Sequence, residues 1–220
     1  EKISEKSVFD IGFGFAQALK YMKNKGLKVA GLEPSKEGVD YARENGIDAI
    51  HCGIERLDLV KDRSEVVLLL NVLEHLRKPE QTLLNIKEKV LTSDGMLVIE
   101  VPNDFNDFQI VADAEYNLDE WWVFPPNHIN YFSHDSLQEL LRGCGYKIIH
   151  CTSSFPLDMF LLFGDQYVGN PKLGRECHNK RVKFEQLMEK HGKVEKLKKF
   201  YNALSELNLG RSISVYATPV

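Results

Sequence analysis

Residues 8–16 read VFDIGFGFA, an apolar run that ends in Asp10 and passes through Gly12 and Gly14 into a helical pattern. Glycine at such a turn lets a ligand approach the backbone without obstruction by a Cβ atom. A helix that starts there offers unpaired N–H groups to polar ligand atoms. The stretch therefore predicts a strand, a ligand-approaching loop and a helix, the first unit of an α/β sheet.

The same alternation of strand and helix continues outward from this unit. Strands are expected at 7–11, 28–33, 49–52, 66–70, 96–101, 146–151 and 213–218. The first helix should carry Phe15 on its apolar face, and Ser35, Pro79 and Ser133 are start signals for later helices. The pattern predicts a doubly wound seven-stranded sheet with helices on both faces. We expect the last strand to close the sheet at its edge.

The chain is expected to form a single domain over residues 1–220, with two departures from the regular alternation. Residues 103–132 lack a clean period and contain Trp121 and Trp122, so an irregular loop that binds an acceptor or acts as a lid is predicted there. Residues 153–210 show apolar and then charged helical patterns, which predict a helical insertion between the last two strands.

Composition excludes several classes of protein. The 220 residues carry a net charge of −4, which gives no overall cation field for nucleic acid. The apolar runs fall far short of the roughly 20 residues that a membrane helix needs. We therefore expect a cytoplasmic protein with neither a nucleic-acid nor a membrane partner.

The four cysteines form no C-x-x-C pair, so no metal site is predicted.

A second acid helps to identify the ligand of the glycine loop. Glu33 ends the second strand about twenty residues after the loop, where a carboxylate can accept both hydroxyls of an adenosine ribose. A dinucleotide fingerprint needs a third glycine, and Gln17 stands in its place, which argues against a nicotinamide-dependent oxidoreductase. Asp10 would repel a diphosphate but would attract the amino group and sulfonium of S-adenosylmethionine.

Three motifs together resemble the class I S-adenosylmethionine-dependent methyltransferases. They are D-I-G-x-G at residues 10–14, L-E-H at 73–75 and H-x-x-Y-F at 128–132. The resemblance spans most of residues 8–149, and it implies a Rossmann-like sheet that is mostly parallel, with an antiparallel last strand. It also implies S-adenosyl-L-methionine as the cofactor and S-adenosyl-L-homocysteine as the product.

The resemblance places the cofactor at the ends of the first four strands. The residues expected there are Asp10, Gly12, Phe13 and Gly14 at the methionyl and ribose portion, Glu33 and Pro34 at the ribose and adenosine, Cys52, Gly53 and Ile54 at the adenine, and Asn71, Val72 and His75 near the methionyl end. Phe13 stands where the family has a smaller residue, so its ring is expected to narrow the methionyl pocket. His75 either contacts the cofactor or caps the following turn.

His128 is the candidate catalytic base, because it lies just before Tyr131 and Phe132 and titrates near neutral pH. The alternative is that His128 hydrogen-bonds to the loop and fixes the shape of the loop. The two tryptophans form either an acceptor wall or packing. His134 is expected at the surface, because the first turn of a helix disfavours a cation.

The sequence thus predicts an S-adenosylmethionine-dependent methyltransferase that acts on a small-molecule acceptor. The segment from Phe155 to Leu209 resembles methyltransferases of bacterial surface-glycan gene neighbourhoods, which implies a sugar hydroxyl as the acceptor. The alternative is a partner subunit that binds the cofactor without catalysis. A homodimer stays open as the assembly.

Overall fold

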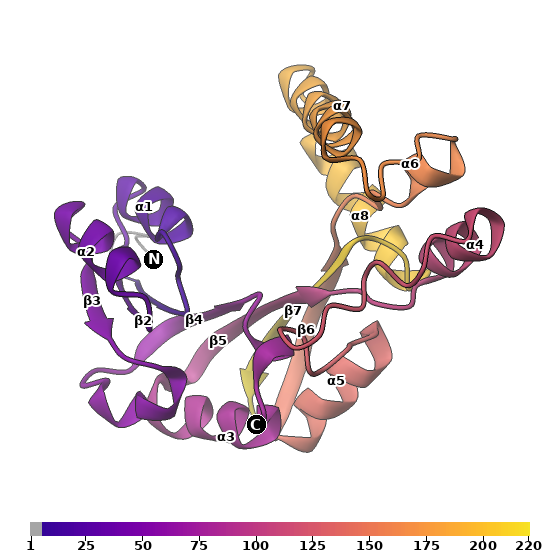
Figure 1. Cartoon of the computed structure of the whole chain (residues 1–220). Helices are drawn as coiled ribbons and strands as arrows, with labels where there is room; N and C mark the ends of the chain where they lie inside the picture. Colours follow the sequence, from indigo (N-terminus) through magenta and orange to yellow (C-terminus); the bar gives the residue numbers. More distant parts are fainter. Residues whose placement is uncertain (1–5) are drawn as a thin grey trace. The chain divides into compact units, whose positions relative to one another are not determined.

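The computed structural model describes residues 6–220, whose strands form one seven-stranded sheet in the order β3-β2-β1-β4-β5-β7-β6 (Figure 1). The strands are β1 (Ser7–Ile11), β2 (Lys28–Glu33), β3 (Asp48–His51), β4 (Ser64–Leu70), β5 (Leu91–Pro102), β6 (Tyr146–Ser153) and β7 (Ser212–Pro219). Residues 1–5 of the predicted domain 1–220 lie outside the described part of the chain. All seven predicted strands are confirmed, with boundaries that shift by a few residues.

The order and direction of the strands confirm the predicted fold class. β1 pairs in parallel with β2 and β4, and β3 and β5 continue this parallel set on either side. β7 runs antiparallel to its neighbours, because its start bonds to the ends of β5 and β6 through Asn103 N–H to Arg211 O and Ser154 N–H to Ser212 O. The prediction that the last strand closes the edge is wrong, since β7 lies between β5 and β6.

The chain divides into two compact units. The first unit holds the described residues up to Val101 together with Gln138–His150 and Val215–Val220, and the second holds Pro102–Leu137 and Cys151–Ser214. The first unit contains the parallel strands and the helices α1 (Gln17–Asn24), α2 (Lys36–Glu44) and α3 (Pro79–Lys89). The second contains α4 (Asp107–Tyr116), α6 (Met159–Leu162), α7 (Pro171–Lys190) and α8 (Val194–Glu206). Helix α5 (His134–Gly143) begins in the second unit and ends in the first.

Helices α1 and α2 cover one face of the parallel strands, and α3 lies on the other face (Figure 1). Leu19 of α1 and Val39 of α2 are fully buried in a core cluster with Val8 and Leu68 of the strands. Helix α1 begins at Gln17, after Ala16 in the left-handed conformation, so Phe15 is not part of it and is 55% exposed. The expectation that Phe15 packs on the first helix's apolar face is therefore wrong.

The predicted start signals work as expected. Ser35 accepts a hydrogen bond from Gly38 N–H at the start of α2, and Pro79 is the first residue of α3. Ser133 accepts from Ser136 N–H at the start of α5. These local contacts set where each helix leaves the sheet.

The stretch predicted as an irregular loop contains a ten-residue helix, α4. Asn106 accepts from Gln109 N–H and Gln109 Oε1 accepts from Asn106 N–H, which is a reciprocal capping box. The signal was the spacing N-x-x-Q, which outweighed the weak helical periodicity. The role of residues 103–132 in acceptor binding stays a prediction.

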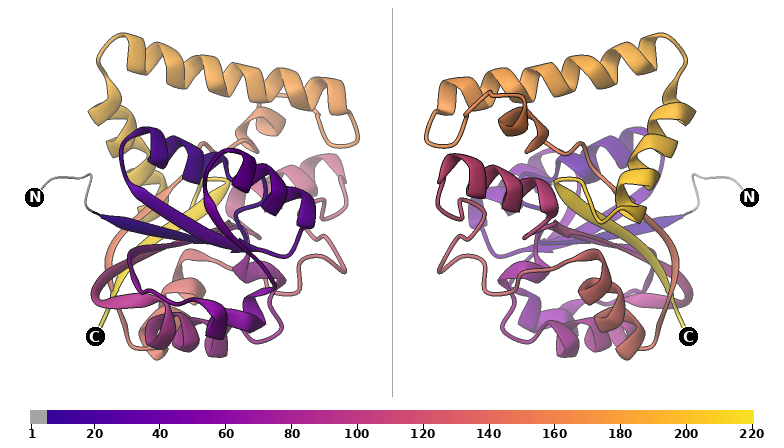
Figure 2. Two further views of the ribbon diagram at one scale, coloured as in Figure 1. Left: turned by 90° about the vertical axis from the view of Figure 1, so that its left-hand side faces the viewer. Right: turned by 90° about the vertical axis from the view of Figure 1, so that its right-hand side faces the viewer.

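The helical insertion before the last strand is confirmed. Figure 2 shows α7 as a long helix from whose end α8 turns back. Asn170 caps the start of α7, because its side chain accepts a hydrogen bond from Leu173 N–H. A turn at Gly192 separates the two helices. Within the described residues, no helix is both long and apolar enough to cross a membrane.

A buried histidine links three elements of the second unit. His134 is only 3% exposed, so its predicted place at the surface is wrong. Ser153 Oγ donates to Leu209 O (2.7 Å) and therefore accepts from His134 Nε2–H (3.0 Å). This assigns His134 Nδ1 as the acceptor for the Ser205 hydroxyl (3.2 Å). Burial lowers the pKa of His134 below its usual value of 6.5, although the neighbouring Asp135 opposes the shift.

We expect the free energy of unfolding to fall as the pH drops below about 6.5, because unfolded His134 then takes up a proton that the folded side chain resists. The loss should be on the order of 1 kcal/mol between pH 7.5 and pH 5.5, measured by urea denaturation. His134→Gln, which does not titrate, should show a flatter dependence over this range. Equal slopes for the two proteins would contradict the assignment.

Candidate functional site

The two acids predicted from the strand ends interact in the first unit. Asp10, near the end of β1, is 3% exposed, and its Oδ1 has no hydrogen-bond partner within residues 6–220. Burial, and secondarily the nearby Glu33 carboxylate, raise the pKa of Asp10 from 3.8 to about 7. At neutral pH this site therefore holds a carboxyl group that a cation or hydrogen-bond donor would stabilise.

Glu33 organises the glycine loop. Its Oε2 accepts from Gly14 N–H and its Oε1 accepts from Ser35 N–H, both at 2.8 Å. One carboxylate thus joins the loop after β1 to the start of α2. Gly38 lets α2 approach the loop closely, because a Cβ at this position would collide with the Gly14 carbonyl oxygen. Sequence reasoning missed Gly38, although its place one turn into a capped helix was visible.

The loops after β1 and β4 lie in direct contact. Gly12 has φ +77°, and its N–H donates to Leu32 O at 2.8 Å. A Cβ on Gly12 would come within 2.7 Å of Val72 Cγ2. Asn71 beside it also has a positive φ, +54°, and its N–H donates to Glu100 O. The structure therefore brings together Gly12, Asn71 and Val72, which the sequence placed at one ligand.

Phe13 lies apart from this contact. Its side chain is 8% exposed and belongs to the core cluster between the sheet and α1. A Cβ on Gly31 of β2 would reach Phe13 Cδ1 at 2.7 Å, so the ring fills the space that Gly31 leaves. The Phe13 ring thus packs in the core, and its predicted narrowing of the methionyl pocket stays a prediction.

The turn after β3 lies against the end of β2. Cys52 N–H donates to Glu33 O at 3.2 Å, and His51 Nε2 lies 3.0 Å from Pro34 O. Gly53 then caps the short 3₁₀ helix η2 (Ile54–Leu59), and Ile54 is half-buried. Pro34 thus follows the strand that carries Glu33, and Cys52, which begins the turn after β3, is hydrogen-bonded to the same strand end.

The L-E-H motif forms the short 3₁₀ helix η3 (Leu73–His75) after β4. Glu74 is 1% exposed, and burial raises the pKa of its carboxyl group. His75 Nε2 lies 3.7 Å from Glu74 Oε1, and the His75 side chain is 42% exposed. Since His75 N–H donates to Val72 O, its backbone closes this turn, while its contact with a cofactor stays a prediction.

His128 lies in an aromatic turn of the second unit. Its N–H donates to Phe124 O (3.0 Å), and the Tyr131 hydroxyl donates to His128 O (3.3 Å). The His128 ring lies 6.1 Å from the Phe124 ring and 6.4 Å from the Tyr131 ring. The backbone contacts fix the turn, so the imidazole itself is not needed for them.

The two tryptophans of this segment pack in the second unit. Trp122 is 3% exposed and its ring lies edge-on to those of Trp121 (4.7 Å) and Phe105 (5.6 Å). Phe105 also contacts the Tyr131 ring at 5.9 Å. Packing is therefore the role that the structure gives to Trp122.

A cavity of about 440 Å³ opens at the opposite end of the parallel strands. Its lining includes Ser7, Lys28, Asp48 and Ser64, the first residues of β1 to β4, and the loop before β4. None of the predicted cofactor residues is among its lining residues. Open α/β sheets bind ligands at the carboxyl ends of their strands, so this cavity is separate from the candidate site.

A family model described as a methyltransferase domain matches residues 1–151. The chain is 28% identical over 157 residues to the ubiquinone biosynthesis O-methyltransferase of Rickettsia canadensis (strain McKiel), with 66% of this chain and 64% of the relative covered. It is 31% identical over 137 residues to the protein of that name from Rickettsia conorii (strain ATCC VR-613 / Malish 7), with 59% and 46% covered. The chain thus spans less than two thirds of the length of either relative.

The fold also matches a solved structure. A structure described as the complex between the Haloferax volcanii Trm112 methyltransferase activator and the putative methyltransferase superposes with a TM-score of 0.62. The match covers 97% of this chain and 82% of that one at 17% identity. This likeness establishes a shared fold.

Replacing Asp10 by Asn should stabilise the ligand-free chain at pH 8, because the buried carboxylate is then ionised beside Glu33. The penalty of the wild-type acid grows as the pH rises from about 4 to about 7 and disappears at low pH. Thermal unfolding should show a gain on the order of 1–3 kcal/mol at pH 8 and almost none at pH 4. Asp48→Asn, an exposed acid at the start of β3, is the matched control and should show no such trend. A destabilised Asp10→Asn at pH 8 would contradict the assignment.

Proposed function

This chain belongs to the methyltransferase-domain family, and from that membership we propose that it transfers a methyl group from S-adenosylmethionine to a small-molecule acceptor. The observation that carries the proposal is the pairing of Asp10 and Glu33 at the carboxyl ends of β1 and β2. Residence in the cytoplasm and assembly as a homodimer stay predictions.

The residues present fit this cofactor. Asp10 Oδ1 is buried without a partner within residues 6–220, as expected of an acid that receives a cationic amino group. Gly12 and Gly14 leave the loop free of side chains, and Glu33 closes the second strand beside it. Pro34, Cys52, Gly53 and Ile54 would hold the adenosine end, and Asn71, Val72 and His75 the methionyl end. When bound, the cofactor supplies an electrophilic methyl group on a sulfonium.

The main contribution of the protein to catalysis is then to position the cofactor and the acceptor. Holding a nucleophile and a methyl group near attack distance provides much of the rate acceleration in such a displacement. We propose that Asp10 and Glu33 fix the cofactor, that the apolar β1 and β4 loops exclude water, and that His128 takes a proton from the acceptor. A base is needed where the acceptor is a weakly acidic hydroxyl.

For the acceptor we propose an oxygen atom. The two Rickettsia relatives carry the name O-methyltransferase, which supports oxygen over nitrogen or carbon. Within that class we propose a sugar hydroxyl of surface-glycan biosynthesis, on the resemblance of residues 155–209. A partner subunit that binds the cofactor without turnover is the alternative.

Calorimetry with S-adenosylhomocysteine tests the cofactor proposal. The wild-type chain should bind it, and Gly12→Ala should bind about tenfold or more weakly, because the new Cβ collides with Val72 and displaces the loop. Adding Val72→Ala to Gly12→Ala should restore part of the affinity. Gly174→Ala, where a Cβ would meet nothing within 4 Å, is the matched control. Absence of binding by the wild-type protein would refute the proposed function.

His128→Ala should lower turnover about 100-fold, measured as S-adenosylhomocysteine release with hydroxylated acceptors, if His128 is the base. The affinity of the variant for the cofactor should stay unchanged. Tyr131→Phe is the control for loop shape, because it removes the hydroxyl that bonds His128 O and Phe124 N–H. A loss below threefold for His128→Ala, or equal losses for both variants, would assign His128 to loop structure.

A further inference from the structure

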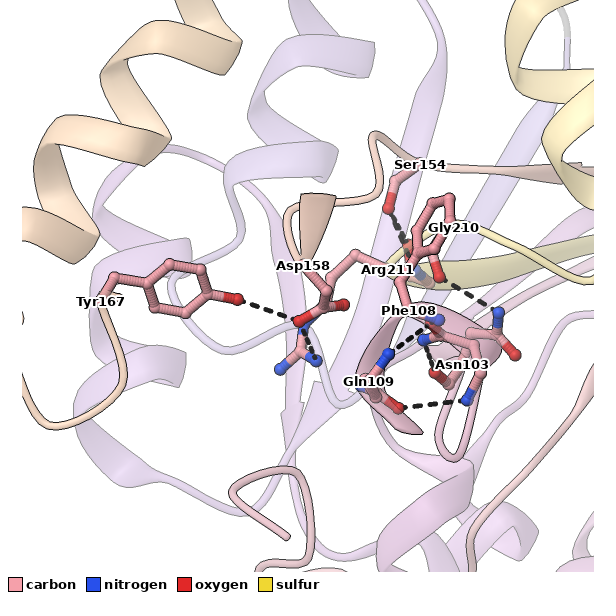
Figure 3. A network of polar contacts seen from close by, with 10 residues as sticks. Asn103, Phe108, Gln109, Ser154, Asp158, Tyr167, Gly210 and Arg211 are labelled. Carbon is pink, nitrogen blue, oxygen red and sulfur yellow. Dashed lines mark hydrogen bonds and ion pairs between the residues drawn. The ribbon is translucent and has the colours of Figure 1, made fainter. Parts of the chain in front are cut away.

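The second unit buries a carboxylate that has too few partners. Asp158, just before α6, is 1% exposed. Figure 3 shows it between Tyr167 and Arg211: the Tyr167 hydroxyl donates to Asp158 Oδ1 at 2.9 Å, and Arg211 Nη1 lies 3.8 Å from the same oxygen. The distance to Arg211 is too long for a direct hydrogen bond.

Two polar atoms of this group are unsatisfied. Asp158 Oδ2 and Arg211 Nη1 are both buried, and neither has a hydrogen-bond partner within residues 6–220. Unpaired buried polar atoms are costly and rare in folded proteins. A carboxylate oxygen needs a donor and a guanidinium N–H needs an acceptor, so one group that both donates and accepts would satisfy the pair.

A third unsatisfied atom lies on α4, which packs against α6. Gln109 is fully buried, and its Oε1 is used by the capping box with Asn106. Its Nε2 donor has no partner in the part of the chain that the structure describes. The elements around Asp158 therefore leave one acceptor and two donors open.

We propose that this group, Asp158, Arg211 and Gln109, is a binding site for the hydroxyl groups of a neutral, polyhydroxylated ligand. One hydroxyl donates to Asp158 Oδ2 and accepts from Arg211 Nη1, and a neighbouring hydroxyl accepts from Gln109 Nε2. The charges of Asp158 and Arg211 cancel, which favours a neutral ligand over an ion. The inference rests on the proposed function in one respect, that the ligand is the methyl acceptor.

The Arg211 side chain lies where a ligand could enter the site from solvent. Its side chain is 39% exposed, although Nη1 is buried beside Asp158. The backbone of Arg211 is fixed, because its carbonyl accepts from Asn103 N–H, so the long side chain is the part that can move. A shift of this side chain opens a path to the buried carboxylate, and Arg211 Nη1 then donates to the hydroxyl that is bound to Asp158.

Saturation-transfer NMR with methyl α-glycosides of glucose, galactose, mannose and rhamnose tests the site. At least one glycoside should give a signal with the wild-type chain, and its fully O-methylated form, which lacks donors, should give none. Asp158→Asn should weaken the affinity about tenfold to a hundredfold, since a hydrogen bond to a charged group is lost. Asp165→Asn is the matched control on the same segment: its partly exposed carboxylate pairs with Lys180 at 2.6 Å, and its loss should leave binding unchanged.

Arg211→Gln serves if Asp158→Asn does not fold, because its side chain is partly exposed, and the same loss is expected. Absence of a signal from every glycoside, or equal affinity of the wild-type and variant proteins, would overturn the site. S-adenosylhomocysteine calorimetry on the same samples separates the two proposals. Cofactor binding without glycoside binding removes the hydroxyl site alone, and glycoside binding without cofactor binding removes the assigned function alone.

Discussion

The candidate site of the first unit depends on the Glu33 carboxylate at the end of β2. Its two oxygens accept from Gly14 N–H and Ser35 N–H, so a single side chain ties the loop after β1 to the start of α2. Burial first, and the nearby Glu33 second, raise the pKa of the neighbouring Asp10 carboxyl.

This arrangement constrains residue size around the loop. A Cβ on Gly12 would clash with Val72, and a Cβ on Gly38 would clash with the Gly14 carbonyl oxygen, so neither position has room for a side chain. The space that Gly31 leaves is filled by Phe13, which joins the loop to the core. The loop is held from both sides before any ligand arrives, which lowers the ordering cost of binding. Functional pockets commonly keep strained or unsatisfied groups, which lower the stability of the folded domain.

The parts of the fold that follow from local pattern could be predicted, and the parts that depend on distant partners could not. Ser35 and Pro79 mark helix starts through contacts within four residues. The place of β7 between β5 and β6 depends on strand pairing that no local pattern encodes. His134 has the sequence context of a surface residue, yet it is buried through bonds to serines 19 and 71 positions away. The residues expected at the cofactor follow strand ends, which the sheet brings to one edge, and their contacts with a ligand stay a prediction, whereas Asp158 has no motif around it.

The unsatisfied groups of the two units differ in the chemistry that they demand. In the first unit, the buried Asp10 lies beside another acid, so the site lacks a positive charge. A cationic ligand would offset both the burial of the Asp10 carboxylate and its repulsion by Glu33. In the second unit, Asp158 faces Arg211, so charge is already balanced and the deficit is one of hydrogen bonds. A cation there would be repelled by the neighbouring guanidinium, while a hydroxyl satisfies both partners without adding charge. A sulfonium nucleoside meets the first of these deficits, and the polyhydroxylated ligand that we propose would meet the second.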